Sequence, residues 1–148
     1  MAFQFRLEAV LTVRKNIEEK MQQKLAREQL TLQNHQLRHA DLQQKRRQLS
    51  GEMEERKKKP VQGSMFLYYM EAMRIQELQL RMLENAIAAQ QKIVEKVRAE
   101  LTEAMKKRKT IDMLREKQLQ EYQLEVRRKE QNESDEQALL RHGHGIMP

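Results

Sequence analysis

The sequence contains no cysteine, which excludes the disulfide frameworks of small secreted domains and every metal site built on thiolates. Aromatic residues make up only 4% of the 148 residues, and hydrophobic residues make up 39%. Globular domains usually hold about 45–50% apolar residues, so this composition argues against a compact α/β or all-β core. Charged residues reach 34%, and good helix formers dominate the rest. This mixture is typical of long helices with a narrow apolar seam.

Proline and glycine are also scarce, with two and four residues respectively. One short stretch, ERKKKPVQGSM, holds both Pro60 and Gly63. Pro60 would cost about 3 kcal/mol inside a helix and disfavours helix at the preceding Lys59. Gly63 provides a flexible turn position, and Ser64 is expected to cap a second helix. We therefore predict a single domain with a helix over about 3–58, a turn over about 59–63, a helix over about 64–138 and a disordered tail over about 141–148.

Long hydrophobic runs are absent as well. The longest, MFLYYM at residues 65–70, is far shorter than the roughly 20 residues that span a membrane. The first residues lack the basic and then apolar layout of a signal peptide. We therefore expect a cytoplasmic protein. Its net charge of +7 permits an acidic partner without requiring one.

Apolar residues recur at alternating steps of three and four on both sides of the break, which is the pattern of a coiled coil. In the first segment they are Leu7, Leu11, Met21, Leu25, Leu32, Leu42, Leu49 and Met53, with polar residues at Arg14, Glu18, Glu28 and Arg46. In the second they are Phe66, Tyr69, Met73, Leu80, Leu83, Ile87, Val94, Val97, Leu101, Ala104 and Ile111, with polar residues at Gln76, Gln90 and Arg108.

Folding the two segments back on each other about Val61 pairs residues whose numbers add up to roughly 121–122. The first helix then ends opposite about Leu119, where Tyr122 and Val126 resume the apolar repeat after a four-residue slip. An apolar stripe without a partner in its own chain indicates a binding surface, and a frayed helix end is the alternative. The predicted fold class is all-α, a long two-helix antiparallel coiled-coil hairpin with an overhanging C-terminal helix.

Sites for chemistry are not evident. The chain has no glycine-rich phosphate loop, and two helices cannot enclose a catalytic triad, so we predict neither an enzyme nor a cofactor. His35 and His39 have metal-ligand spacing, but no further ligand is obvious across the seam, so we predict no metal. Basic clusters at 56–59, 106–109 and 127–129 lie four residues from acids, as on solvated helix faces, and nucleic-acid binding is not predicted.

Methionine is concentrated just after the break, at Met65, Met70, Met73 and Met82. Methionine adapts to irregular surfaces and is common where partners vary. Residues 65–70 also hold more apolar side chains than a two-helix seam uses. We expect either a docked partner near the tip of the hairpin or a wider local core closed by the loop.

Three segments resemble the family of the flagellar export protein FliJ. They are FQFRLEAVLTVRKNIEEK at residues 3–20, LENAI at 83–87 and KKRKTIDMLREKQLQEYQLEVRRKEQNESDE at 106–136. The resemblance implies a two-helix antiparallel coiled coil, similar to the central stalk of rotary ATP synthases and to injectisome stalk proteins. It also implies a place in the pore of a hexameric export ATPase, contact with the cytoplasmic domain of the export gate, and handling of substrate chaperones.

The same resemblance implies two sets of binding residues. The ATPase-binding set comprises Phe3, Phe5, Leu7, Val10, Leu11, Leu119, Tyr122 and Val126. The export-gate-binding set comprises Gln79, Leu83, Ala86 and Gln90. Leu83 and Ala86 match the family's residue types, whereas Gln79 and Gln90 replace an aromatic residue and a histidine found in some relatives.

The expected function is that of a non-enzymatic stalk, monomeric when alone and associated with the inner membrane at the flagellar base only through its partners. The alternatives are an injectisome stalk protein, a general coiled-coil scaffold and an RNA-binding hairpin.

Overall fold

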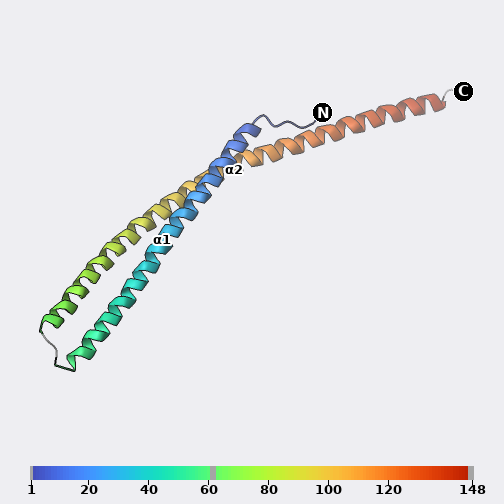
Figure 1. The fold of residues 1–148 in the computed structure, drawn as a ribbon. Helices are drawn as coiled ribbons and strands as arrows, with labels where there is room; N and C mark the ends of the chain where they lie inside the picture. Colours follow the sequence, from blue (N-terminus) through green and yellow to red (C-terminus); the bar gives the residue numbers. More distant parts are fainter. Residues whose placement is uncertain (1, 61–62, 147–148) are drawn as a thin grey trace. The chain divides into compact units, whose positions relative to one another are not determined.

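The computed structural model describes residues 2–60 and 63–146, and it contains two long helices, α1 (Glu8–Lys57) and α2 (Gly63–Ile146) (Figure 1). The described residues include no strand. The contacts divide the chain into two units. The terminal unit comprises Met1–Glu19 with Glu103–Pro148, and the hairpin unit comprises Lys20–Thr102. The predicted centre of the turn at Val61 lies outside the described residues.

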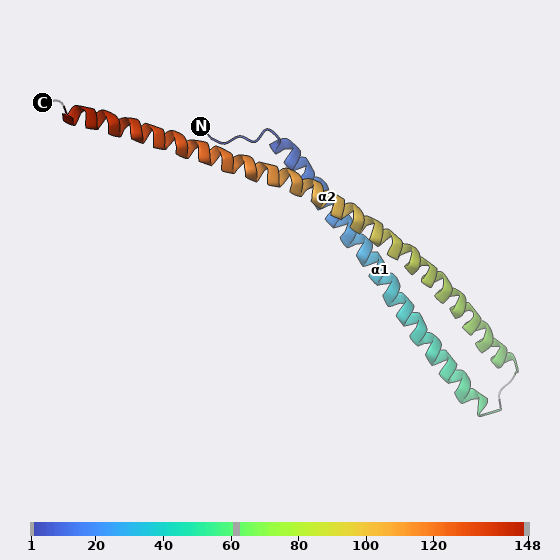
Figure 2. The ribbon, with the colours of Figure 1, turned by 180° about the vertical axis from the view of Figure 1, so that it is seen from behind.

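In the hairpin unit α1 and α2 run antiparallel, as Figures 1 and 2 show. Polar contacts between the helices fix their register: the residue numbers add up to 118 for Gln90 with Glu28 and to 124 for Lys24 with Glu100. The predicted sum of 121–122 lies between these values. The prediction of an all-α, antiparallel two-helix hairpin is confirmed.

The predicted seam is the interior of both units. From Leu7, directly before α1, to Met53 on α1, every position of the repeat is buried or half-buried, including the polar ones. Leu11 and Val97 are the most enclosed, each with 2% of its surface exposed. Phe66 departs from the prediction, because 41% of its surface is exposed. Gln76 also keeps a buried side-chain oxygen without a hydrogen-bond partner among the described residues.

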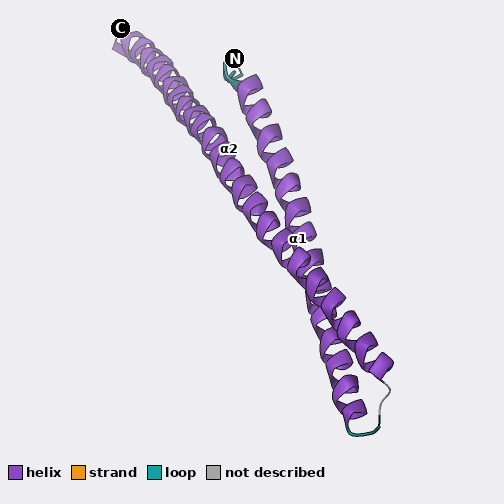
Figure 3. Cartoon of the chain, turned by 90° about the vertical axis from the view of Figure 1, so that its left-hand side faces the viewer, coloured by secondary structure: helices purple, strands orange, loops and turns teal. Residues whose placement is uncertain are grey.

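The terminal unit begins with an extended segment, so α1 starts at Glu8 and not near residue 3 as predicted (Figure 3). The carbonyl of Phe5 accepts a hydrogen bond from the backbone N–H of Glu8 at 3.1 Å. Phe5 is buried, and the ring of Phe3 lies 5.5 Å from that of Tyr122. The extended backbone therefore places both aromatic side chains against the unit's interior. Burial of these two rings compensates for the loss of one further turn of helix.

Both ends of α2 differ from the prediction. The helix begins at Gly63, so Ser64 lies in its first turn and does not precede it as a cap. The other end reaches Ile146, past the predicted limit near residue 138 and into the tail predicted to be disordered. Good helix formers fill residues 136–141, and Gln131 donates to Asp135 one turn later, at 3.2 Å, whereas Gly143 and Gly145 near the end of the helix are weak helix formers. Met147 and Pro148 lie outside the described residues.

Gly51 lies in the interior of α1, where a glycine destabilises the helix and close packing does not require one. A Cβ atom at this position would meet no other atom within 4 Å, and no described glycine has positive φ. Because glycine destabilises a helix interior by about 1 kcal/mol relative to alanine, Gly51→Ala should raise the free energy of unfolding by about that amount. Urea denaturation followed by circular dichroism measures the change. Gln48→Ala, an exposed change in the same helix, should shift stability by only a few tenths. A destabilised Gly51→Ala variant would show that this glycine has a packing role.

Candidate docking surfaces

Most residues predicted to bind the ATPase help to hold the terminal unit together. Leu11 and Phe5 are buried, and Leu7, Phe3, Leu119, Tyr122 and Val126 are half-buried. Tyr122 is in contact with Phe3. The expectation that Leu119, Tyr122 and Val126 form a stripe without a partner is therefore wrong. The N-terminal segment, extended where helix was predicted, reaches this part of α2.

An exposed apolar stripe does exist in the terminal unit, one residue away from the seam. Val10, Val13 and Ile17 follow steps of three and four along α1, and all three are exposed. Leu124 is exposed on α2. Among these four residues, only Val10 belongs to the ATPase-binding set that the resemblance implied. The other residues could have been found from the sequence, because a second run of apolar residues at steps of three and four lies next to the first.

Beyond Val126, α2 continues without support from the rest of the described chain. Every side chain from Arg127 to Gly143 is exposed, including those of Leu139 and Leu140. Helices in proteins owe most of their stability to packing of an apolar face. This end of α2 therefore has both the length and the exposed apolar residues to gain stability from a partner.

The four predicted gate-binding residues fall into different environments in the hairpin unit. Gln79 is exposed and lines a shallow hollow together with half-buried Leu83 and with Met82, whose side chain is 72% exposed. Ala86 is half-buried. Gln90 is buried, and its side-chain amide donates to the backbone carbonyl and the carboxylate of Glu28 at 3.0 and 2.5 Å. Gln90 therefore joins the two helices, and the accessible surface is centred on Gln79 and Met82.

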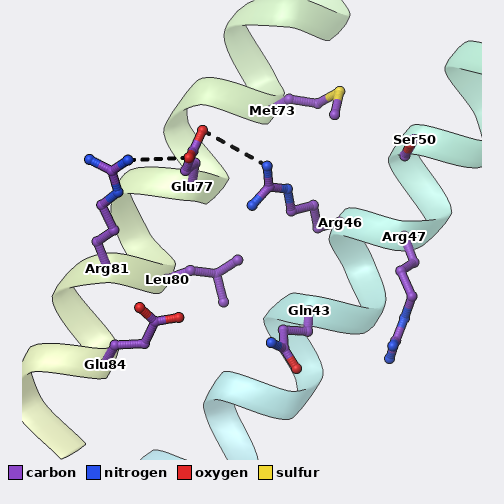
Figure 4. Close-up of a pocket in the computed structure, with 9 residues that line it drawn as sticks. All are labelled: Gln43, Arg46, Arg47, Ser50, Met73, Glu77, Leu80, Arg81 and Glu84. Carbon is purple, nitrogen blue, oxygen red and sulfur yellow. Dashed lines mark hydrogen bonds and ion pairs between the residues drawn. The ribbon is translucent and has the colours of Figure 1, made fainter. Parts of the chain in front are cut away.

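A second open hollow lies between the helices nearer the tip (Figure 4). Glu77 forms an ion pair with Arg46 across the helices at 3.8 Å, and it accepts a hydrogen bond from Arg81 on its own helix at 3.4 Å (Figure 4). Ser50 lies on the rim, with no histidine among the lining residues. Five charged side chains line the hollow, and Glu77 pairs with two of them.

His39 does have a carboxylate across the seam, where no further ligand was expected from the sequence. Its Nε2 lies 3.1 Å from Oε1 of Glu84, and Glu84 is exposed. Among the described residues no group of three or more histidine, aspartate or glutamate side chains is arranged to hold a metal ion. The pair is an inter-helix contact at a weakened seam position.

The strongest polar contact in the terminal unit joins two residues that the sequence marked separately as interruptions of the seam. Arg108 donates from Nε and an NH2 group to the two carboxylate oxygens of Glu18, at 2.6 and 3.3 Å. The hydrogen bond with Glu18 raises the pKa of the Arg108 guanidinium, and Asp112 adds a further ion pair at 3.5 Å. Glu18 and Arg108 lie opposite each other in only one register of the two helices. The pair therefore helps to align α1 with α2.

In comparison with known protein families, residues 3–145 match the family model described as Flagellar FliJ protein. Searches of curated proteins and of solved structures returned no significant match. Among the described residues, no helix is long and apolar enough to cross a membrane.

The Glu18–Arg108 pair can be tested by single and double replacement. Glu18→Ala should lower the thermal unfolding midpoint, since it leaves the half-buried guanidinium without its main partner. The double variant Glu18→Leu with Arg108→Leu should recover or exceed the original midpoint, because apolar residues at matched seam positions pack without a desolvation cost. Scanning calorimetry measures both. The structural role of the pair would be refuted if Glu18→Ala left the midpoint unchanged.

Proposed function

The chain belongs to the flagellar FliJ protein family, and on that premise we propose that it is a non-enzymatic stalk of the flagellar protein export apparatus. Its terminal unit binds the hexameric export ATPase, and its hairpin unit binds the cytoplasmic domain of the export gate. The family assignment makes the chain a protein related to flagellar export. The two contacts are proposals that the exposed surfaces support.

The observation that carries the ATPase contact is the end of α2. Seventeen consecutive helical residues, 127–143, have exposed side chains, and Leu139 and Leu140 are among them. A long helix of this kind fits the pore of a ring, where it would meet several subunits at once. The stripe of Val10, Val13 and Ile17 adds apolar surface on α1 of the same unit. Leu11 and Phe5 support the contact indirectly, because they hold the unit together.

The gate contact rests on the hollow around Gln79, Met82 and Leu83. Arg38, Asp41 and Lys45 also line this hollow, and exposed Leu78, one turn before Met82, adds apolar surface beside it. Leu83 and Ala86 keep the residue types that the family uses for this contact. Gln90 acts through its bonds to Glu28, which fix the local register of the two helices.

The remaining parts of the proposal rest on the family alone. They are a cytoplasmic location at the flagellar base, substrate chaperones as further partners, and a monomer in the absence of partners. In this proposal the protein binds its partners by apolar and ionic contacts and performs no chemistry of its own.

Co-elution with the purified export ATPase tests the first contact. Val13→Asp and Leu139→Asp should each weaken binding by about tenfold or more, because each places a charge on a surface that becomes desolvated in the complex. Leu30→Asp is the matched control, an equally exposed apolar residue of α1 in the hairpin unit, and it should bind like the original protein. Equal binding by all four proteins, or an ATPase whose hydrolysis ignores the added chain, would disprove the contact.

Binding to the isolated cytoplasmic domain of the gate tests the second contact and separates two roles. Met82→Asp should weaken the affinity by about tenfold or more without lowering the unfolding midpoint, because Met82 is largely exposed. Gln90→Ala should lower the midpoint, since it removes both bonds to Glu28. Titration calorimetry and thermal unfolding give the two readouts. Normal gate affinity of Met82→Asp would rule out this surface.

A further inference from the structure

The first two turns of α2 are apolar on nearly every side, which distinguishes them from the rest of the helix. Of the six residues from Met65 to Met70, only Tyr69 is buried. Leu67 and Tyr68 are 69% and 70% exposed, and the other three are between 41% and 49% exposed. The wider local core allowed for by the sequence therefore does not form among the described residues.

The end of α1 lies at the same end of the hairpin unit and adds a run of four cations, Arg56–Lys59 (Figures 1 and 3). The chain has no acidic residue between Arg56 and Met70. The cations and the apolar residues are in direct contact: the Nζ of Lys57 lies 5.9 Å from the centre of the Phe66 ring, and Arg56 donates to the sulfur of Met65 at 3.0 Å. We name the residues 56–59 and 65–70 together the tip surface.

Nearby acids leave the tip surface positive. Glu54 and Glu55 pair with Lys57 and Lys58 one turn away, at 3.2 and 3.4 Å. Beyond Met70, two hydrogen bonds from Arg74 lower the pKa of Glu71 and engage both of its oxygens. Within the described residues, Arg56 and Lys59 have no carboxylate partner.

We propose that the tip surface binds directly to the surface of an anionic lipid bilayer. A docked helix or a binding groove requires an apolar stripe on one face, whereas here the apolar residues surround the helix. Such an end can enter the boundary between headgroups and acyl chains, with Leu67 and the methionines in the apolar layer. The phenol of Tyr68 fits the interface, and the lysines reach lipid phosphates while their stems stay apolar.

Lipid explains these residues better than a nucleic acid does. Four cations would attract either polyanion. A nucleic acid, however, gains neither base stacking nor hydrogen bonds from Leu67, Met65 and Met70. In such a complex these exposed side chains would stay in water. In a bilayer the same three side chains are buried. The proposal replaces the expectation that the protein reaches the membrane only through partners, and it does not depend on the proposed function.

Flotation of the full chain with vesicles tests the proposal. The protein should float with vesicles of phosphatidylcholine and phosphatidylglycerol in equal parts, and not with phosphatidylcholine alone. Leu67→Ser with Tyr68→Ser, and separately Lys58→Gln with Lys59→Gln, should each lower binding by about tenfold or more. Two matched pairs elsewhere, Leu30→Ser with Leu37→Ser and Lys107→Gln with Lys109→Gln, should leave binding unchanged.

A fluorescent reporter locates the contact, because the chain has no tryptophan. The emission of a Tyr68→Trp variant should shift to the blue on anionic vesicles and be quenched by brominated acyl chains. A Leu37→Trp variant should show neither effect. Circular dichroism of every variant checks that the helices are intact.

Three outcomes would overturn the proposal. The first is no flotation with anionic vesicles. The second is flotation that the tip variants and the lysine controls reduce equally, since binding would then follow net charge alone. The third is normal flotation of the tip variants with loss of binding to single-stranded RNA or to a protein of the export apparatus, which would assign the tip surface to that partner. Loss of ATPase co-elution would leave this result unaffected, because that test uses Val13 and Leu139.

Discussion

Burial of one narrow seam between two long, polar helices is the constraint on which the structure depends. Neither α1 nor α2 has enough apolar surface to be stable alone, and each covers the apolar positions of the other. Four of the polar residues in the seam are paired across it: Gln90 bonds to Glu28 and Arg108 to Glu18. Gln76 differs from these, because its buried side-chain oxygen has no hydrogen-bond partner among the described residues. The seam is therefore specific in register because its polar residues match at one alignment.

The same constraint decides which side chains remain for binding. Leu11, Phe5 and Gln90 were assigned to partners by resemblance, yet they are buried inside the protein's own units. Direct contact with a partner would require the helices to separate at these positions. Residues next to the seam, such as Val13 and Met82, can bind without that cost. Substitutions of the buried residues Leu11, Phe5 and Gln90 should therefore lower stability before they lower affinity for a partner.

The sequence was sufficient for the helices, their antiparallel register and the positions of the seam, because a repeat of three and four residues directly reports which face of a helix is buried. It was insufficient at the ends. The extended segment before Glu8 depends on the distant contact of Phe3 with Tyr122, which local helix propensity does not contain. Phe66 continues the repeat but has no partner deep enough to cover it. For the candidate sites, resemblance supplied residue positions, and only packing separated accessible from buried members.

The few aromatic residues of the chain are concentrated in two places, the terminal unit and the tip surface. The chain has six, and none lies in the long middle part of the seam, which is filled mainly by aliphatic residues. Phe3, Phe5 and Tyr122 close the interior of the terminal unit, where α1 has not yet begun. Phe66, Tyr68 and Tyr69 are at the tip surface, where only Tyr69 is buried. Aromatic side chains thus serve one unit by completing its interior, whereas at the tip two of the three face outward beside four cations. Burial within the hairpin does not account for Phe66 and Tyr68, and their exposure beside the cations is the observation that supports the proposed contact with a lipid surface.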